Sequence, residues 1–145
     1  MREILYYPQI DKQKLETVKN LIDRINETSP NDDYIEELNR ITGKSYKAIE
    51  FMEYWGWTDL DTLAEKALTA EPPRICDLTT NEIEEIVSLV KTCFISDDNK
   101  AEYYMELLHK SLSLTDVMSY IMSGKDAAAI ANDMMIAASN SVIAL

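Results

Sequence analysis

The residue types that most often act in catalysis or metal binding are few in this sequence, and their spacing fits neither role. Cys76 and Cys93 are the only cysteines, His109 is the only histidine, and their spacing fits no metal site. We also find no glycine-rich phosphate loop, no nucleophile motif and no histidine-based acid–base pair. We therefore expect no enzyme activity, no catalytic residue and no cofactor. Both cysteines are interpreted as reduced thiols, with Cys93 a small buried hydrophobe.

One acidic run superficially resembles a cation site. Asp97-Asp98-Asn99 offers oxygen ligands of the kind that Ca²⁺ binds, but the run lacks the glycine and the distal glutamate of a calcium loop. We therefore predict no metal site at this run and interpret it as the start of a helix.

The chain is strongly acidic, with a net charge of −12 over 145 residues. A nucleic-acid-binding domain normally presents a basic face to the phosphates, so direct binding to nucleic acid is not expected. Helix–glycine–helix runs at 41–45 and 55–58 could suggest a helix-turn-helix, but residues 30–70 carry nine acidic and four basic side chains, which argues against it. An acidic surface can steer a basic partner, or it can simply be solvated.

The second half of the chain predicts four helices. Thr79 and Glu82 have the spacing of a capping box, Ser96-Asp97-Asp98 ends one helix and caps the next, and Asp126 caps the last. The apolar stripes that follow these starts recur at helical spacing. In chain order they are Ile83, Ile86, Val87, Val90 and Phe94; Ala101, Tyr104, Met105 and Leu108; Val117, Met118 and Ile121; and Ile130, Ala131, Met134, Met135 and Ala138.

The first half predicts the same plan after an extended lead-in over residues 1–10. Candidate helix starts and ends are, in chain order, Asp11, Ser29-Pro30, Gly43, Ser45, Gly56 and Thr58. The inward stripes are Leu15, Val18, Ile22 and Ile25; Tyr34, Ile35, Leu38 and Ile41; Tyr46, Ile49 and Met52, with Tyr54-Trp55; and Leu60, Leu63, Ala64, Ala67 and Leu68. Glu71-Pro72-Pro73 is the clearest linker, because two prolines cannot continue a helix.

The stripes of the two halves coincide when the sequence is shifted by 66 to 68 residues. The alternative is chance similarity, because any two amphipathic helices share a stripe. The order of the helices and their loop lengths favours duplication. The expected fold is therefore all-α, with two tandem four-helix units at 1–73 and 74–145, and each half carries a net charge of −6.

The second half resembles the colicin E-type and pyocin-type nuclease immunity proteins, a family of small, acidic four-helix proteins. The resembling residues are Leu78-Thr79-Thr80-Asn81-Glu82-Ile83, Ile86-Val87-Ser88-Leu89-Val90, Ser96-Asp97-Asp98, Leu107-Leu108 and Thr115-Asp116-Val117-Met118-Ser119-Tyr120. In the last piece Ser119 stands where the family has its first tyrosine, and Ile121 stands where it has a proline. The first half joins the resemblance only through the internal repeat.

The resemblance implies an inhibitor that binds a basic toxin domain beside its active site and neutralises it; in keeping with the family, the expected toxin is a nuclease. In the family, the second helix selects the toxin and the third supplies a shared anchor. The resemblance implies that the toxin is selected by Asp97, Asp98, Glu102, Tyr103 and Glu106. It also implies that the shared anchor consists of Asp116 and Tyr120. The corresponding toxin-binding residues of the first half, implied through the internal repeat and hereafter the duplicated set, are Asp32, Asp33, Glu36, Glu37, Glu50, Tyr54 and Trp55. The toxin class, the repeat that makes the contact and the oligomeric state are left open.

Other readings remain beside this one. Single acidic residues can be solvated, and Tyr54, Trp55 and Tyr120 can be core residues. We expect Trp57 to pack at a helix junction and Met118, Met122, Met134 and Met135 to fill the core. A general helical adaptor without inhibitory activity is the alternative function. We find no signal peptide and expect no membrane span, so a cytoplasmic protein is expected.

Overall fold

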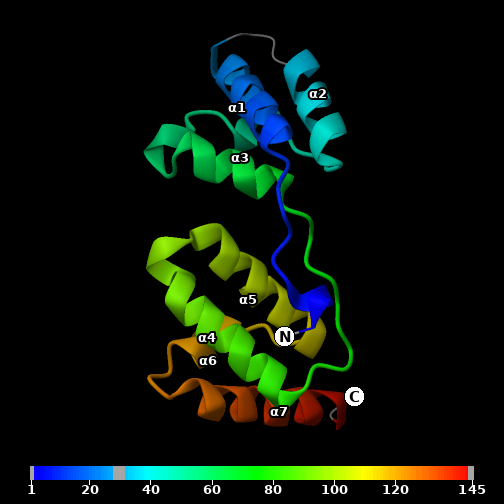
Figure 1. Cartoon of the computed structure of the whole chain (residues 1–145), viewed down its shortest axis with the longest axis vertical. Coiled ribbons are helices and arrows are strands. Elements are labelled where there is room, and N and C mark those ends of the chain that lie inside the picture. Colours follow the sequence, from blue (N-terminus) through cyan, green and yellow to red (C-terminus); the bar gives the residue numbers. More distant parts are fainter. Residues whose placement is uncertain (1, 28–31, 144–145) are drawn as a thin grey trace. The chain divides into compact units, whose positions relative to one another are not determined.

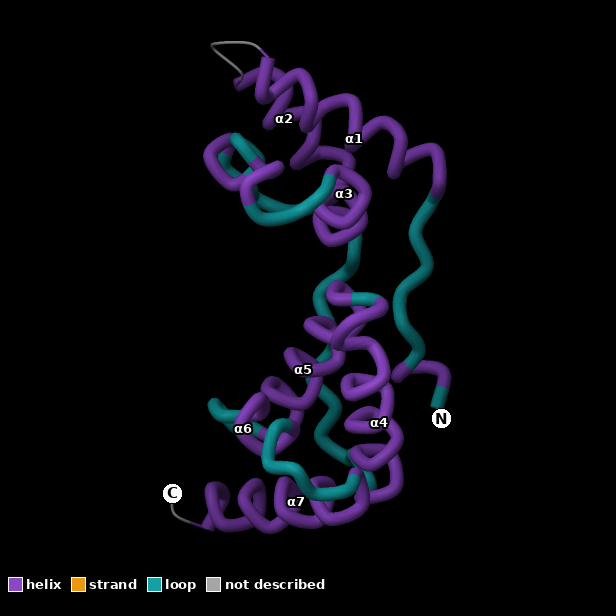
Figure 2. Tube along the Cα trace, turned by 90° about the vertical axis from the view of Figure 1, so that its left-hand side faces the viewer, coloured by secondary structure: helices purple, strands orange, loops and turns teal. Residues whose placement is uncertain are grey.

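The computed structural model describes residues 2–27 and 32–143, with side chains described as far as residue 139. Within these ranges the regular structure is entirely helical, as the all-α prediction requires (Figures 1 and 2). The chain forms two compact units. Pro8–Ala70 is hereafter the smaller unit, and Met1–Tyr7 together with Glu71–Leu145 is the larger unit.

Seven α-helices and three short 3₁₀ turns are present in the described part of the chain. In order they are η1 (Glu3–Leu5), α1 (Lys12–Glu27), α2 (Asp32–Thr42), η2 (Ala48–Glu50), η3 (Tyr54–Gly56), α3 (Leu60–Leu68), α4 (Thr80–Ser96), α5 (Asp98–Leu112), α6 (Val117–Ile121) and α7 (Ala127–Ile143).

In the larger unit, α4 packs against both α5 and α7, and α6 contacts α5 and α7. The predicted capping box is present: Thr79 Oγ1 accepts the Glu82 amide at 3.2 Å, and Glu82 Oε1 accepts the Thr79 amide at 3.0 Å. Asp97 caps α5 by accepting the Lys100 amide. Cys93 is 7% exposed and packs in the core, as predicted.

The N-terminal lead-in belongs to the larger unit, and its expected place in a unit spanning 1–73 is wrong. Leu5 is fully buried there, and its carbonyl oxygen accepts a 2.7 Å hydrogen bond from Tyr104 Oη. The Arg2 guanidinium contacts the Glu82 carboxylate at 2.5 Å and the Asp77 carboxylate at 3.1 Å. These contacts hold residues 2–7 against the second half of the chain.

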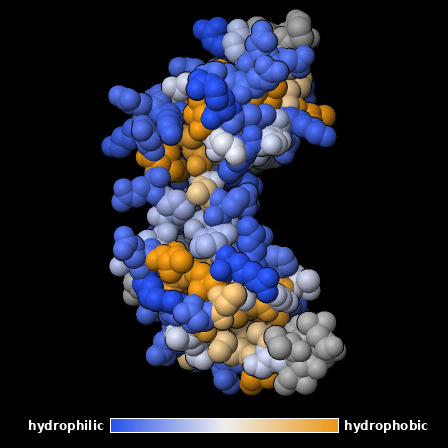
Figure 3. Space-filling model, turned by 90° about the vertical axis from the view of Figure 1, so that its right-hand side faces the viewer, coloured by the Kyte–Doolittle hydropathy of each residue, from blue (hydrophilic) through white to orange (hydrophobic). Residues whose placement is uncertain are grey.

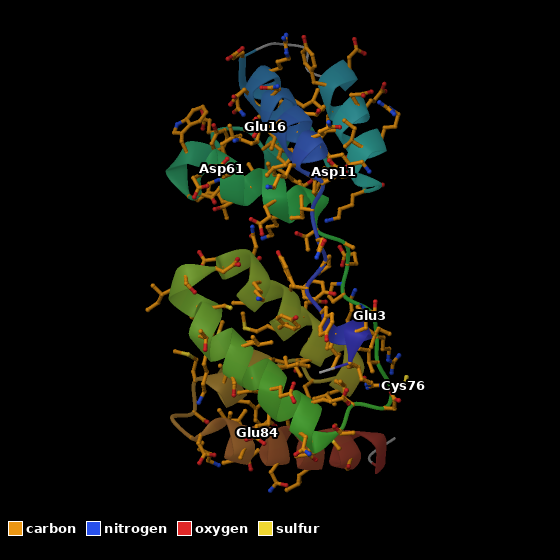
Figure 4. The ribbon with its side chains drawn as sticks, in the orientation of Figure 1. Glu3, Asp11, Glu16, Asp61, Cys76 and Glu84 are labelled. Atoms are coloured by element: carbon orange, nitrogen blue, oxygen red, sulfur yellow. The ribbon has the colours of Figure 1, made fainter. Side chains whose placement is uncertain are left out.

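In the smaller unit, α1 packs against α2 and α3. Lys19 Nζ on α1 lies 2.5 Å from Asp61 Oδ1 on α3 and 3.4 Å from Glu16 Oε1 (Figure 4). Asp11 caps α1 as predicted, since its carboxylate accepts the Gln13 amide. The cap of α3 is Asp59, which accepts the Thr62 amide at 2.8 Å, and the prediction of Thr58 is wrong by one residue. The Ser29-Pro30 start lies outside the described residues.

The predicted third helix over 45–56 does not form. This segment contains the separate turns η2 and η3, and Glu53 between them is left-handed, with φ +54°. Here the side chains of two asparagines form hydrogen bonds with backbone groups that would bond other backbone groups in an α-helix. The Asn39 side chain pairs with the amide and carbonyl of Tyr46, and the Asn26 side chain pairs with the Phe51 carbonyl and the Glu53 amide. The described part of the smaller unit therefore has three α-helices, where four were expected.

The two units bury corresponding positions. α1 contacts α2 and α3 as α4 contacts α5 and α7, and η3 contacts α3 as α6 contacts α7. Three pairs of residues separated by 67 or 68 positions are fully buried in both units: Val18 and Ile86, Ile22 and Val90, and Ala64 and Ala131. The first helix of each unit thus occupies the centre of its own core.

Candidate functional site

Helix α5 carries the predicted acidic side chains on one exposed face. Asp98, Glu102 and Glu106 follow one another at four-residue spacing, and all three are exposed. The opposite face of the helix is buried, with Tyr104, Leu107 and Leu108 in the core. Because the buried face fixes the rotation of the helix, the carboxylates form one stripe directed to solvent. Asp97 lies apart from this stripe, half-buried at the N-cap.

Tyr103 is not part of this exposed face, and its assignment to toxin selection is contradicted by its surroundings. The residue is 7% exposed. Its ring meets those of Tyr7 and Tyr104 edge-on, each at a centroid distance of 5.3 Å. Burial raises the pKa of the Tyr103 phenol. The lead-in supplies Tyr7, so the tyrosine that was expected to contact a partner instead holds the N-terminal segment.

The predicted anchor residues lie on α6, which contacts α5. Asp116 is exposed immediately before the helix and its side chain makes no capping bond, while Tyr120 is half-buried against the core. The His109 ring on α5 bonds the Leu114 carbonyl through Nδ1, which ties the connection before α6 to the end of α5. The anchor pair therefore lies at a helix that contacts the helix carrying the acidic stripe. Met118 and Met122 are 48% and 67% exposed there, so their expected core role is wrong.

In the smaller unit, α2 carries the duplicated acidic set. Asp32, Asp33 and Glu36 are exposed. Glu37 is half-buried, and its carboxylate accepts a 3.0 Å hydrogen bond from Arg40 Nε, which lowers the pKa of that carboxyl. Arg40 is exposed one turn beyond Glu36 and offsets part of the negative charge. The α2 face is therefore less uniformly acidic than the α5 face.

The remaining predicted residues surround η3. Glu50 is exposed and accepts the Lys47 amide at 2.6 Å. Tyr54 is half-buried, and its hydroxyl lies 3.3 Å from Asp23 Oδ1; burial, followed by this nearby carboxylate, raises the pKa of the Tyr54 phenol. Trp55 is 65% exposed, with its ring edge-on to that of Tyr54 at 5.4 Å. Trp55 is thus a surface residue, supported by a tyrosine that is partly core.

Sequence reasoning missed three further exposed residues in this segment. Ile49 and Met52 were assigned to the core and Trp57 to a helix junction, but they are 76%, 45% and 62% exposed. The residue that faces the core is Phe51, at 1% exposure. Its partner Tyr46 stacks edge-on at 5.1 Å. Helical spacing predicted the wrong residues of this segment to be buried, because its backbone is not an α-helix.

The described residues line hollows in both units. A hollow of about 130 Å³ in the smaller unit is lined by Tyr46, Glu50, Phe51, Trp57, Leu63, Lys66 and Ala67. An open depression of about 660 Å³ follows α4 in the larger unit, where Figure 4 labels Glu84, and is lined by Asn81, Glu84, Glu85, Ser88, Leu89 and Thr92. On the face drawn in Figure 3, hydrophobic and hydrophilic side chains lie side by side in both units.

No family model, curated protein or solved structure matched the chain in the three comparisons made. Within the described residues, no helix combines the length and the apolar character needed to cross a membrane.

Proposed function

We propose that this protein is an immunity-type inhibitor that binds and neutralises a basic bacterial toxin domain, most simply a nuclease, without catalysing a reaction itself. The observation that carries the proposal is the exposed Asp98–Glu102–Glu106 stripe on α5, a helix that contacts the α6 segment with Asp116 and Tyr120. The resemblance of the second half to the nuclease immunity family supports it, and each unit would then be a variant of that family's helical fold.

The physical basis of the proposal is charge complementarity. A nuclease domain needs a basic surface to hold phosphates. A row of carboxylates on one helix, in a chain with a net charge of −12, would attract that surface and speed encounter. Tyr120 would then contribute a partly desolvated aromatic contact, of the kind that carries most of the affinity in protein interfaces.

Inhibition would follow from position and charge. An acidic protein bound beside a basic active site repels nucleic acid and blocks its path. The acids around the anchor would select the toxin, since an unmatched basic surface leaves carboxylates unpaired. Such an inhibitor would act in the cytoplasm of the cell that makes the toxin.

The proposal is tested by calorimetry against a purified basic nuclease toxin domain of the colicin or pyocin type, at low and at high salt, with nucleic-acid cleavage followed on the same mixtures. We expect nanomolar or tighter binding, which weakens as salt increases, together with loss of cleavage. Tight binding with cleavage intact would reject inhibition and support the helical adaptor. No detectable binding would reject the proposed partner.

A further inference from the structure

The segment from Ile49 to Trp57 presents four large hydrophobic side chains to solvent within nine residues. Ile49, Met52, Trp55 and Trp57 are 76%, 45%, 65% and 62% exposed. Single exposed hydrophobic residues are common, but a group that includes both tryptophans of the chain is typical of an interaction surface. This group is hereafter the tryptophan patch.

The tryptophan patch borders the hollow of about 130 Å³. Trp57 belongs to both, and Phe51, Leu63 and Ala67 give the hollow apolar walls. An apolar protein cavity of about 150 Å³ is known to hold one benzene molecule. The hollow therefore matches one aliphatic or aromatic side chain of a partner.

The backbone that carries the patch is fixed by specific contacts. The Asn26 side chain bonds the backbone of Phe51 and Glu53, and the Asn39 side chain bonds the backbone of Tyr46. Both asparagines come from the packed helices α1 and α2. The patch is thus presented on an ordered surface, so little conformational entropy would be lost when a partner covers it.

The charge around the patch indicates what covers it. Residues 46–61 contain four acidic side chains, Glu50, Glu53, Asp59 and Asp61, and one basic side chain, Lys47. All five are exposed. Outside this range, Lys19 pairs with Asp61 and Lys66 lines the hollow, so the acidic excess rests mainly on Glu50, Glu53 and Asp59. A second copy of this chain would place like charges opposite one another, whereas a basic protein would pair with them. An arginine or lysine of that protein could also stack on the exposed Trp55 ring.

We propose that the tryptophan patch and its hollow form a docking surface for a basic protein, which inserts one apolar side chain between Trp57 and Leu63 and places its cationic side chains on the surrounding carboxylates. The inference rests on the proposed function for the identity of this protein, the toxin domain. It assigns a direct contact to the smaller unit, through residues outside the set that the family resemblance implies.

The test uses the full chain labelled with 5-fluorotryptophan, which gives two ¹⁹F signals because the chain has two tryptophans. Trp55→Phe assigns the signals. The toxin domain is added while calorimetry on the same samples reports complex formation. A shifted Trp57 signal in the complex supports the docking surface. An unshifted Trp57 signal in a formed complex overturns it and leaves the proposed function standing, while absence of a complex overturns both.

Variants separate contact from a distant effect. Ile49→Ser and Met52→Ser alter exposed side chains, so both should fold, and we expect each to weaken binding by about tenfold or more. Ile136→Ser on α7 is the matched control, because Ile136 is 52% exposed in the larger unit, and its affinity should equal that of the parent. Parental affinity in both patch variants would overturn the inference.

Discussion

Asn26 on α1 hydrogen-bonds to the backbone on both sides of Met52. Its side-chain oxygen accepts the Glu53 amide at 2.7 Å, and its side-chain nitrogen donates to the Phe51 carbonyl at 3.0 Å. The same nitrogen also donates to the Ile22 carbonyl at 2.8 Å. Asn26 therefore stabilises the left-handed Glu53 and joins the segment that carries the exposed tryptophans to the centre of the smaller unit.

Asn26→Asp should destabilise the smaller unit. A carboxylate cannot donate to the Phe51 and Ile22 carbonyls and would face them with negative charge, so we expect a loss of about 1 to 3 kcal/mol in unfolding free energy. Denaturant unfolding followed by tryptophan fluorescence measures the change. Asn20→Asp, an exposed site on the same helix, supplies the same charge change and should cost little. Equal effects of the two substitutions would contradict the role of Asn26.

Tyr104→Phe should loosen the N-terminal segment, because it leaves the buried Leu5 carbonyl without its donor. We expect a loss of about 1 to 3 kcal/mol in unfolding free energy at neutral pH. Faster amide exchange in residues 2–7 than in the parent would localise the effect. Unchanged exchange in those residues would show that the hydrogen bond does not hold the segment.

Alkaline pH should act on the same contact. Burial, with the neighbouring Tyr103, raises the pKa of Tyr104 from its ordinary value of 10 to about 12. The folded state thus holds this proton more tightly than the unfolded state, so the stabilisation is complete below about pH 10 and is lost as the pH rises through about 12. Guanidinium unfolding across this range should show a fall in the parent that is smaller in Tyr104→Phe. Parallel curves would contradict this assignment.

Reversing charge in the α5 stripe should slow association with the toxin domain. For Glu106→Lys we expect the association rate at low salt to fall several-fold, with a smaller effect at high salt. Glu3→Lys makes the same change in net charge at another exposed site of the larger unit and should change the rate less. Stopped-flow mixing measures both variants. Equal slowing would mean that net charge, and not the stripe, steers encounter.

Tyr120→Ala and Tyr54→Ala compare the two corresponding tyrosines. Both are half-buried, but Tyr120 lies on α6, which contacts the helix carrying the acidic stripe, whereas the Tyr54 hydroxyl faces Asp23. We expect Tyr120→Ala to weaken toxin binding by at least about 30-fold, as a hot-spot truncation does, and Tyr54→Ala to act mainly through support of Trp55. Calorimetry of folded variants decides the ranking, and a larger loss for Tyr54→Ala would reverse it.

Local sequence signals correctly predicted a helix where a capping motif is followed directly by an apolar stripe at helical spacing. The capping box at Thr79 and the stripe from Ile83 to Val90 correctly predict α4. The helix predicted after Ser45 does not form, because backbone groups of this segment bond the side chains of Asn26 and Asn39, which lie on the two preceding helices. Helical periodicity carries no information about such partners, so Phe51 was missed as a core residue.

The predictions for the candidate site also succeeded where local sequence patterns determine exposure and failed where contacts distant in sequence do. The family resemblance supplied the acids of α5, and three of them, Asp98, Glu102 and Glu106, lie on the exposed face opposite the apolar stripe. Tyr103 was misplaced because it is covered by Tyr7, about a hundred positions away in the sequence, and no local pattern predicts that contact. Trp57 offered one usable signal: two tryptophans around a glycine, beside acidic residues, is an unusual composition for a buried turn.

The most direct test of inhibition is a cleavage assay in which the toxin domain, at fixed concentration well above the expected Kd, is titrated with this protein. We predict that nuclease activity falls linearly and vanishes at a fixed molar ratio, as tight stoichiometric inhibition requires. Activity that persists at a large molar excess of this protein, under conditions where calorimetry shows a saturated complex, would contradict the account.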